Sequence, residues 1–286
     1  MILINGSEGI GSGHAQKILP IHPENIRKYL KARLQDKKLD SSLMIPYYNG
    51  FKGTVTEGEN KNQYIITGVV KRVSGTKTEL TEVTPNYNYK SLIAAFDKLV
   101  DSGKIKSYDD LCDPKTDTFH LVVKHSDFSK MSDEEILKLF KQITTVTENL
   151  TAIDNKNRVI LFSSPAELFE FYYVNMLEII AKRKQYLLDN MHSDIILDLS
   201  RYSFIKNITE DKIIISKRTK ADIIAQLGQF NDIVTSDGTY DYLLRMPVYS
   251  LTEEKMQELL DKIKKAKEAL NVLLETSEKA LWLQEI

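Results

Sequence analysis

The sequence of 286 residues contains a single cysteine, Cys112, and only five histidines. One cysteine excludes an internal disulfide and any zinc site built from several cysteines, which is typical of proteins from a reducing compartment. The histidines lack metal-ligand spacing with further ligands beside them, and no Ser, His and Asp pattern indicates a nucleophile with its base. We therefore expect neither a metal site nor a catalytic residue in this segment.

Long apolar runs are also missing from the sequence. The longest, such as Met1–Ile4 and Val159–Phe162, are far shorter than the roughly 20 residues that a membrane-spanning helix requires. No basic stretch followed by an apolar one opens the chain, so we expect no signal peptide. These absences predict a cytoplasmic protein with no membrane partner.

An excess of basic charge is missing as well. Lys and Arg number 39 against 40 Asp and Glu, which gives a net charge of −1. Nucleic-acid-binding proteins usually carry a basic surface. Only residues 1–40 are mildly basic, with seven Lys or Arg against four acids. Charge alone therefore does not predict a nucleic-acid partner.

Glycine, in contrast, is concentrated in one place, because four of the 12 glycines lie between Gly6 and Gly13. Glycine tolerates positive φ and the close approach of another group, so we expect a loop with an unusual backbone here. His22 and Pro23 then begin a helix that continues to about Leu34.

Residues 47–162 alternate between strand and helix signals. The predicted elements are a hairpin of Tyr64–Val73 and Thr76–Val83, a helix over Tyr89–Val100, a strand at Phe119–Lys124, a helix from the cap Ser132 through Phe140, and a hairpin of Leu150–Ile153 and Arg158–Phe162. Together they predict an α+β unit over residues 1–160.

Residues 161–286 are dominated by helix signals. Ser164 and Pro165 have the residue types of a cap and a first helical position, and the helix over residues 165–205 would be about 60 Å long. A second helix begins at Thr252 and has heptad spacing. The expected seam residues are Tyr172, Met176, Ile179, Leu187, Met191, Ile195 and Leu199 on the first helix, and Leu259, Ile263, Ala266, Leu270 and Leu273 on the second.

Between the two long helices the sequence predicts a small globular head. Its elements are a strand at Lys212–Ser216, a helix over Thr219–Leu227 and a turn at Ser236–Gly238. This order predicts an antiparallel helical pair with the head inserted between its arms.

Several motifs occur in the order that one known family has them. They are Asn5-Gly6-Ser7-Glu8-Gly9-Ile10-Gly11-Ser12-Gly13, Tyr48–Thr54, Thr116-Asp117-Thr118, Lys182–Leu188, Asp211–Ile215 and Tyr242–Thr252. Across essentially all of its length, the sequence resembles the carboxy-terminal part of the DNA breakage-reunion subunit of type IIA DNA topoisomerases. The Leu3–Gly6 start and the Met246–Leu251 run are most similar to eukaryotic, viral and tailed-phage members. Among these, a tailed-phage medium subunit or a viral enzyme is the source that we predict.

The resemblance implies an α+β fold class, with a mixed α/β tower domain followed by a long antiparallel coiled coil that carries a small globular gate head. It implies a DNA-contacting segment and tower over residues 1–160, and a coiled coil over residues 161–286 with an exit-gate head at about 200–250. The implied partners are double-stranded DNA and a second copy of the chain. In a phage, the implied location is the host cytoplasm or nucleoid.

The resemblance also implies what this segment lacks. The nucleophilic tyrosine is expected upstream of Met1, and the metal-binding and ATPase domains farther upstream or on separate subunits. Mg²⁺ and ATP are implied for the complete enzyme and no cofactor for this segment, which alone should be inactive.

The DNA contact that the resemblance implies centres on Ile10. In the family, the isoleucine at this position enters between base pairs of the DNA segment to be opened and bends it, and the flanking Gly9 and Gly11 let the backbone come close. The candidates for phosphate contacts are Lys17, Lys28 and Lys52. The alternative is a buried isoleucine in a glycine-rich turn and lysines on solvated faces.

The dimer contact that the resemblance implies lies in the head. The candidate interface residues are Leu199, Tyr202, Tyr240, Tyr242, Leu243, Met246 and Tyr249. The alternative is that these side chains form only the core of the head.

Two other functions fit parts of the sequence. A DNA-independent scaffold that dimerises through its coiled coil would need the same long helices. A nucleotide-binding enzyme would use the glycine segment, but Gly9-Ile10-Gly11-Ser12-Gly13 lacks the third glycine at the spacing of a dinucleotide fingerprint.

Overall fold

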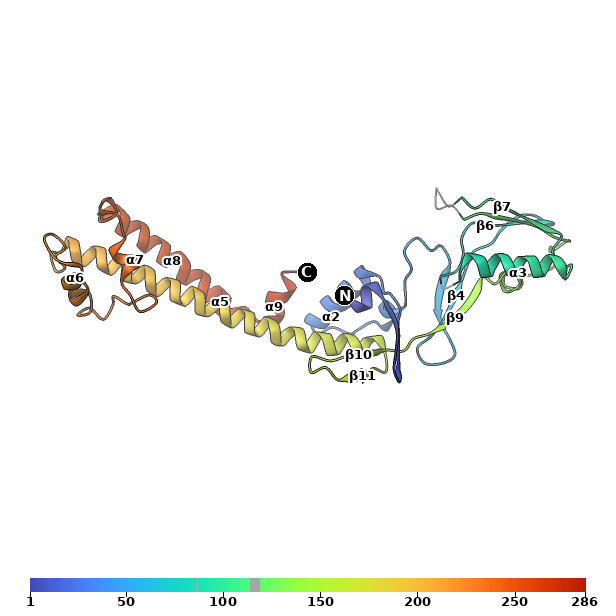
Figure 1. Ribbon diagram of the computed structural model, residues 1–286, viewed down its shortest axis with the longest axis horizontal. Helices are drawn as coiled ribbons and strands as arrows, with labels where there is room; N and C mark the ends of the chain where they lie inside the picture. Colours follow the sequence, from blue (N-terminus) through green and yellow to red (C-terminus); the bar gives the residue numbers. More distant parts are fainter. Residues whose placement is uncertain (86, 114–118) are drawn as a thin grey trace. The chain divides into compact units, whose positions relative to one another are not determined.

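The computed structural model describes residues 1–85, 87–113 and 119–286 (Figure 1). The chain divides into two compact units, Met1–Tyr173 and Val174–Ile286. The predicted Thr116-Asp117-Thr118 motif lies outside the described residues. The α+β composition of the fold is confirmed.

Unit 1 begins with a short helix, a hairpin and a longer helix: α1 (Ile2–Asn5), β1 (Ser7–Gly11), β2 (His14–Ile18) and α2 (Pro23–Leu34). Helix α2 starts as predicted, because His22 Nδ1 accepts a hydrogen bond from the Glu24 backbone N–H at 3.1 Å and Pro23 occupies the first turn. Its buried face includes Tyr29, whose ring meets Phe169 edge-on at 4.9 Å. The glycine segment forms a β-hairpin rather than a loop, and Gly6 and Gly13 have the positive φ that its glycines led us to expect.

A three-stranded antiparallel sheet follows, after the 3₁₀ helix η1 (Ser41–Met44). Its strand order is β3 (Thr54–Glu57), β4 (Gln63–Thr67) and β9 (Ile143–Thr147). Ile66 on β4 and Val146 on β9 are buried with Leu19, which follows β2. The core of this sheet therefore extends to the base of the β1–β2 hairpin.

The second sheet of unit 1 has the order β5 (Lys71–Ser74), β6 (Lys77–Leu80), β8 (Leu121–Lys124) and β7 (Ser107–Asp110). Helices α3 (Tyr89–Asp101) and α4 (Asp133–Leu139) contribute apolar side chains to its core. The capping box at Ser132 is present, with the Glu135 backbone N–H donating to Ser132 Oγ at 3.2 Å. These helices and the strand before His125 were predicted correctly.

The predicted strand Tyr64–Val73 is wrong as one element. It is two strands in two different sheets, β4 and β5, and the chain leaves the first sheet at Gly68. A Cβ at Gly68 would lie 2.9 Å from the side-chain oxygen of Gln142, so a side chain at this position would require Gln142 to shift. The β5–β6 hairpin after it was predicted correctly.

A last hairpin of unit 1, β10 (Thr151–Ile153) and β11 (Val159–Leu161), precedes the longest helix. Helix α5 (Pro165–Thr209) has 45 residues, and Ser164 Oγ accepts from the Glu167 backbone N–H at 3.2 Å. The predicted hairpin and the predicted helix start are confirmed.

In unit 2, α8 (Glu253–Glu275) runs antiparallel to α5, as Figure 1 shows. Lys262 Nζ lies 2.6 Å from Asp198 Oδ2, and Lys184 Nζ donates to the Thr276 carbonyl at 2.7 Å. The Lys184 side chain is largely buried, and its ammonium binds carbonyls at the end of α8. The C-terminal helix α9 (Glu278–Leu283) was not predicted from the sequence.

The predicted seam of α5 is only partly correct. Ile195 is buried, but Ile179 and Leu187 are exposed. Since Lys184 already reaches the last turn of α8, Ile179 lies beyond the end of its partner helix. Asp198 faces α8, and a rotation of about 100° per residue turns Leu199 away from the seam.

The head of unit 2 contains α6 (Lys220–Leu227), α7 (Asp241–Leu244) and the 3₁₀ helix η2 (Val248–Ser250). The predicted strand Lys212–Ser216 is wrong. Ile214 donates its backbone N–H to Gln226 Oε1 at 3.0 Å, and its carbonyl accepts from Gln226 Nε2 at 3.3 Å. The side-chain amide thus takes the place of a neighbouring strand.

Candidate nucleic-acid interface

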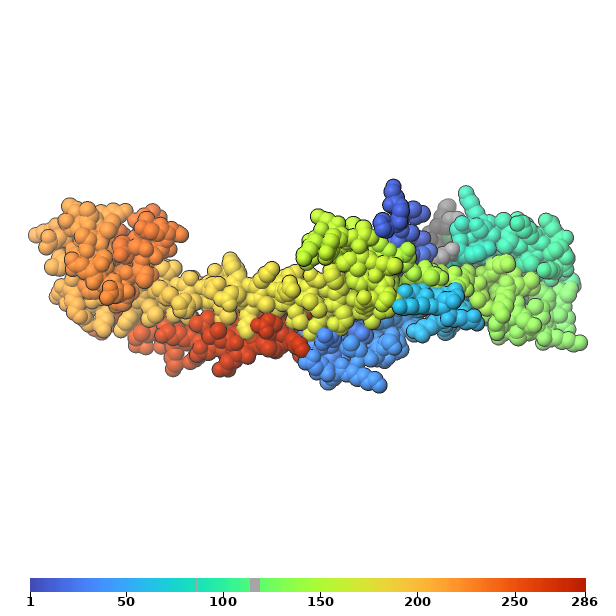
Figure 2. Space-filling view, turned by 90° about the horizontal axis from the view of Figure 1, so that it is seen from below, coloured from blue at the N-terminus to red at the C-terminus, as the bar shows by residue number. Residues whose placement is uncertain are grey.

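The β1–β2 hairpin carries the predicted DNA contact at its tip. Ile10 pairs with Ala15 across the two strands, and Gly13 closes the turn with a φ of +80°. The Ile10 side chain is 95% exposed, so the alternative of a buried isoleucine is wrong. Figure 2 shows the dark-blue hairpin standing out from the neighbouring surface of unit 1.

The glycines of the hairpin differ in what they do. Gly6, at its base, has a φ of +69°, and a Cβ there would lie 2.9 Å from the Ile18 carbonyl oxygen, so the fold requires glycine. A Cβ at Gly9 would meet nothing within 4 Å, and one at Gly11 only the His14 carbonyl oxygen at 3.8 Å. No contact within the described residues therefore explains Gly9 or Gly11.

The base of the hairpin is tied to the segment between β9 and β10. Lys17 and Asn149 exchange two backbone hydrogen bonds, each 2.9 Å long. Gln16 Nε2 donates to the Thr151 carbonyl at 2.5 Å. The hairpin is therefore anchored at its base, while Ile10 at its tip is exposed.

Lys17, predicted to contact phosphate, is bound within the hairpin. Its Nζ lies 3.0 Å from Glu8 Oε1 on the neighbouring strand. Glu8 is largely exposed, and ion pairs of this kind stabilise a fold by at most about 1 kcal/mol. A DNA phosphate could therefore replace Glu8 as the partner of Lys17 at little cost.

The other basic candidates lie at separate places in unit 1. Lys28 is exposed on α2, and Lys52 is exposed in the segment before β3. Arg72 on β5 is bound internally: its Nε lies 2.6 Å from Asp133 Oδ1, and its Nη1 donates to the Phe128 carbonyl at 3.1 Å. Arg72 therefore holds α4 to its sheet rather than offering a free cation.

A buried carboxylate that sequence analysis missed lies under the hairpin. Glu148 Oε1 accepts the Leu19 backbone N–H at 2.8 Å, and the side chain is almost fully buried. Burial raises the pKa of Glu148 to about 7, against the Leu19 N–H and the Tyr64 hydroxyl, which lower it. Burial, with the charge of Glu148, raises the pKa of Tyr64 in turn. Glutamates are mostly exposed, so no sequence signal distinguished this one.

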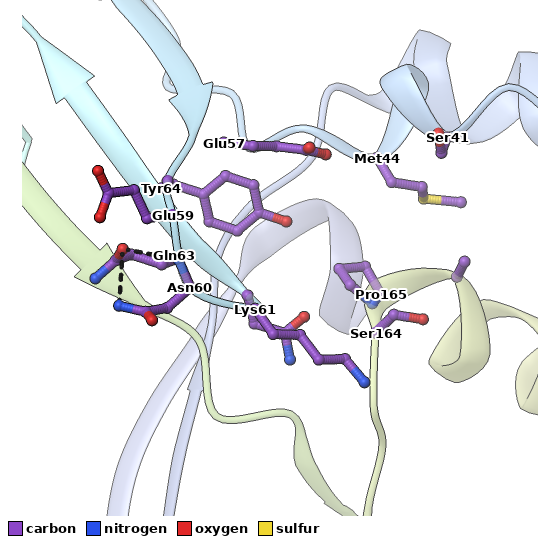
Figure 3. A pocket seen from close by; sticks show the side chains of 13 residues that line it. Ser41, Met44, Glu57, Glu59, Asn60, Lys61, Gln63, Tyr64, Ser164 and Pro165 are labelled. Carbon is purple, nitrogen blue, oxygen red and sulfur yellow. Dashed lines mark hydrogen bonds between the residues drawn. The ribbon is translucent and has the colours of Figure 1, made fainter.

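A cavity of about 440 Å³ lies beside this region, between the β3–β4 turn, η1 and the start of α5 (Figure 3). The Tyr64 ring, Glu57, Lys61 and Met44 line it. Its mixed charges do not favour one sign of ligand. Among the described residues, no group of three His, Cys, Asp or Glu side chains is arranged to hold a metal ion.

The head contains the predicted dimer contacts, but the structure separates them into two kinds. Leu243 is 1% exposed in the core of the head, so its assignment to a surface contact is wrong. Tyr242 is also held internally, because its hydroxyl donates to the Val234 carbonyl at 2.6 Å. Tyr240 and Met246 pack against the same core.

Few of the predicted interface residues are strongly exposed. Tyr249 is 81% exposed, and its neighbour Val248, which sequence analysis did not select, is equally exposed. Leu199 is 36% exposed and Tyr202 is half-buried. Of the predicted interface residues, Tyr249 has the most accessible side chain.

Within the part of the chain that the structure describes, no helix combines the length and the apolar character needed to cross a bilayer.

The sequence model of one family, described as the A subunit of DNA gyrase/topoisomerase IV, matches residues 1–286. The chain is 28% identical over 296 residues to the mitochondrial DNA topoisomerase 2 of Dictyostelium discoideum, and 28% identical over 334 residues to DNA topoisomerase 2 of Arabidopsis thaliana. Both alignments cover 100% of this chain, but only 23% and 22% of the relatives. The chain thus spans less than a quarter of their length.

The fold is similar to that of a solved structure, the Plasmodium falciparum topoisomerase II DNA-binding, cleavage and re-ligation domain. The TM-score is 0.76 over 99% of this chain and 42% of that chain, at 24% sequence identity. These relatives are eukaryotic, and a phage or viral source stays a prediction.

Proposed function

Because the chain belongs to the family of DNA gyrase and topoisomerase IV A subunits, we propose that it acts within the DNA cleavage and rejoining core of a type IIA topoisomerase. Its unit 1 binds and bends the duplex that will be opened, with the second sheet as the tower. Its unit 2 forms a coiled coil and a dimeric exit gate through which the transported duplex leaves. Family membership favours this function over a DNA-independent scaffold.

The observation that carries the DNA-bending role is the exposure of Ile10 at the tip of the anchored hairpin. An apolar side chain inserted between two base pairs is removed from water, which offsets an unstacking cost of a few kcal/mol per base step. Gly9 and Gly11 leave room on both sides for the DNA backbone, which explains two glycines that no contact within the described chain requires.

The chemistry of strand cleavage belongs to the rest of the complete enzyme. The described residues offer no carboxylate cluster for Mg²⁺. The glycine segment forms a hairpin rather than a phosphate-binding turn before a helix, so it does not fit ATP. No step through either group is assigned to this chain, and its own part is to bind, bend and hold.

The experiment that tests the bending role is Ile10→Ala in the complete enzyme. We expect DNA bending, measured by energy transfer between dyes at the two ends of a duplex, and DNA cleavage to fall strongly. ATP hydrolysis in the absence of DNA should stay nearly unchanged, because the exposed Ile10 side chain lies outside the core of unit 1. Unaltered bending would contradict the proposal.

A matched control is Ile153→Ala. Ile153 is an exposed isoleucine on the neighbouring β10–β11 hairpin, so the substitution removes the same apolar atoms from another hairpin of the same unit. We expect it to leave bending unchanged. An equal loss of bending in both variants would indicate a general effect of surface hydrophobicity.

A further inference from the structure

We propose that Glu148 is a positioning residue for the β1–β2 hairpin, and that its protonation state sets how firmly this hairpin is held. The inference rests on the proposed function, because the hairpin matters through the Ile10 that it presents to DNA. It adds a regulation of that site by pH.

Glu148 connects the hairpin with the three-stranded sheet. It directly follows β9, and its backbone N–H donates to the Asn62 carbonyl at 2.8 Å, beside β4. Its carboxylate accepts the Leu19 N–H at 2.8 Å, one residue after β2 ends. The next residue, Asn149, pairs with Lys17. Two consecutive residues thus fix the end of the hairpin to the sheet.

A carboxylate is a costly choice for this position. The Glu148 side chain is 6% exposed, and burial of an ionised carboxylate without a paired cation is unfavourable. Its second oxygen, Oε2, is buried without a hydrogen bond of normal geometry in the described part of the chain. A glutamine could accept the same Leu19 N–H with no charge. Unlike a glutamine, the glutamate has a charge that depends on pH.

The charged and titratable groups around Glu148 come from strands β2, β3 and β4 and from the β3–β4 turn. Tyr64 on β4 faces it, and Glu57 on β3 acts on Tyr64 in turn. Lys61, in the β3–β4 turn, lines one cavity together with Glu148. Lys17 on β2 directs its ammonium to Glu8. Burial is the largest cause of the raised pKa of Glu148.

The sign of the pH effect follows from comparing the anchored and released hairpin. In the anchored state the pKa of Glu148 is raised from 4.5 to about 7, and in a released state water restores the ordinary value. The anchored state therefore binds the proton more tightly, and a rise in pH up to about 7 favours release. Above that pH both states are ionised, so no further change occurs. When the pH falls from about 8 to about 6, the equilibrium constant for anchoring the hairpin rises roughly tenfold.

The first measurement is hydrogen exchange of the Leu19 amide in the 286-residue chain, corrected for the intrinsic pH dependence of exchange. We expect about tenfold higher protection near pH 6 than near pH 8. Glu148→Gln should make the profile flat. Tyr64→Phe should move the midpoint to higher pH, because the Tyr64 hydroxyl lowers the pKa of Glu148. This second variant keeps the carboxylate and tests the mechanism even where the first alters folding.

The matched control is Asp154→Asn. Asp154 is another buried carboxylate, in the turn of the β10–β11 hairpin, and its hydrogen bonds with Arg158 hold its pKa below the usual range. Its removal should leave the Leu19 profile unchanged between about pH 6 and pH 8. A profile with the same midpoint in Glu148→Gln, or no midpoint in the unmodified chain, would overturn the inference.

The second measurement is DNA bending by the complete enzyme. Glu148→Gln should bend DNA more than the unmodified enzyme near pH 8 and equally near pH 6, because the uncharged amide keeps the hairpin anchored. If Ile10→Ala leaves bending intact while Leu19 protection still follows Glu148, the proposed function is wrong and the anchoring role stands. If the pH profile of Leu19 protection is the same with and without the Glu148 carboxylate while Ile10→Ala abolishes bending, the anchoring role of Glu148 is wrong and the proposed function stands.

Discussion

The tip of the β1–β2 hairpin and the head of unit 2 both present apolar residues that the sequence assigned to contacts with other molecules. Ile10 at the hairpin tip is almost fully exposed and its glycine neighbours meet almost nothing. In the head, Leu243 and Tyr242 are bound into the local core, whereas Tyr249 and its neighbour Val248 are strongly exposed. An apolar side chain indicates an external contact only where the fold gives it no internal one.

This difference predicts that replacing a side chain by a smaller one has opposite effects in the two regions. At the hairpin tip, loss of a side chain should reduce DNA bending and leave the free energy of unfolding unchanged. In the core of the head, loss of a side chain should affect folding first.

The largest effect is expected for Leu243→Ala. Removing a fully buried leucine leaves a cavity and costs about 2–5 kcal/mol in the free energy of unfolding. Chemical denaturation of the 286-residue chain, followed by circular dichroism, measures this loss. A change below about 1 kcal/mol would mean that Leu243 is not a core residue, and the comparison would fail on its head side.

A smaller effect is expected for Tyr249→Ser. Tyr249 is 81% exposed, so the free energy of unfolding should change by less than about 0.5 kcal/mol. If the head forms the exit gate, loss of an interface tyrosine should raise the dimer dissociation constant about tenfold or more. Analytical ultracentrifugation of the chain measures this.

The control for Tyr249→Ser is Val272→Ser, which removes an exposed apolar side chain from α8 outside the head. It should leave self-association unchanged. Equal association of the Tyr249→Ser variant and the unmodified chain would contradict a gate at this surface.

The smallest effect on stability is expected for Gly9→Ala. A methyl group at this position meets no atom of the described chain within 4 Å, and φ is not positive, so the free energy of unfolding should change by less than about 0.5 kcal/mol. In the complete enzyme, the same methyl group should reduce bending if the DNA backbone comes as close as proposed. Gly6→Ala, where the fold has no room, should destabilise unit 1 and serves as the contrast.

Sequence patterns predicted the elements whose signals are local. Caps at His22, Ser132 and Ser164 begin three helices where expected, because each cap is a contact between residues two or three apart. The Ser236–Gly238 turn is present for the same reason, with positive φ at Asp237 and Gly238.

The predictions were wrong where the local structure depends on a contact with a residue distant in sequence. The strand expected at Lys212–Ser216 is absent because its backbone groups are satisfied by Gln226, and the strand expected from Tyr64 ends where Gly68 meets Gln142. Periodicity on α5 could not show that α8 ends opposite Lys184.

The candidate site follows the same rule. Ile10 was identified through the resemblance, and its exposure agrees with the predicted role without testing it. Glu148 was missed, because burial of a glutamate depends on Leu19 and Tyr64, which are far from it in sequence.

The amide of Gln226 has a consequence for the lifetime of any contact that the head makes. An unpaired strand at the surface invites another chain to add a strand beside it, and such pairing leads to aggregation or domain swapping. By occupying the N–H and carbonyl of Ile214, Gln226 leaves these groups unavailable for that kind of adhesion. If the head forms the proposed exit gate, two heads that meet through side chains alone can separate again, as repeated opening requires.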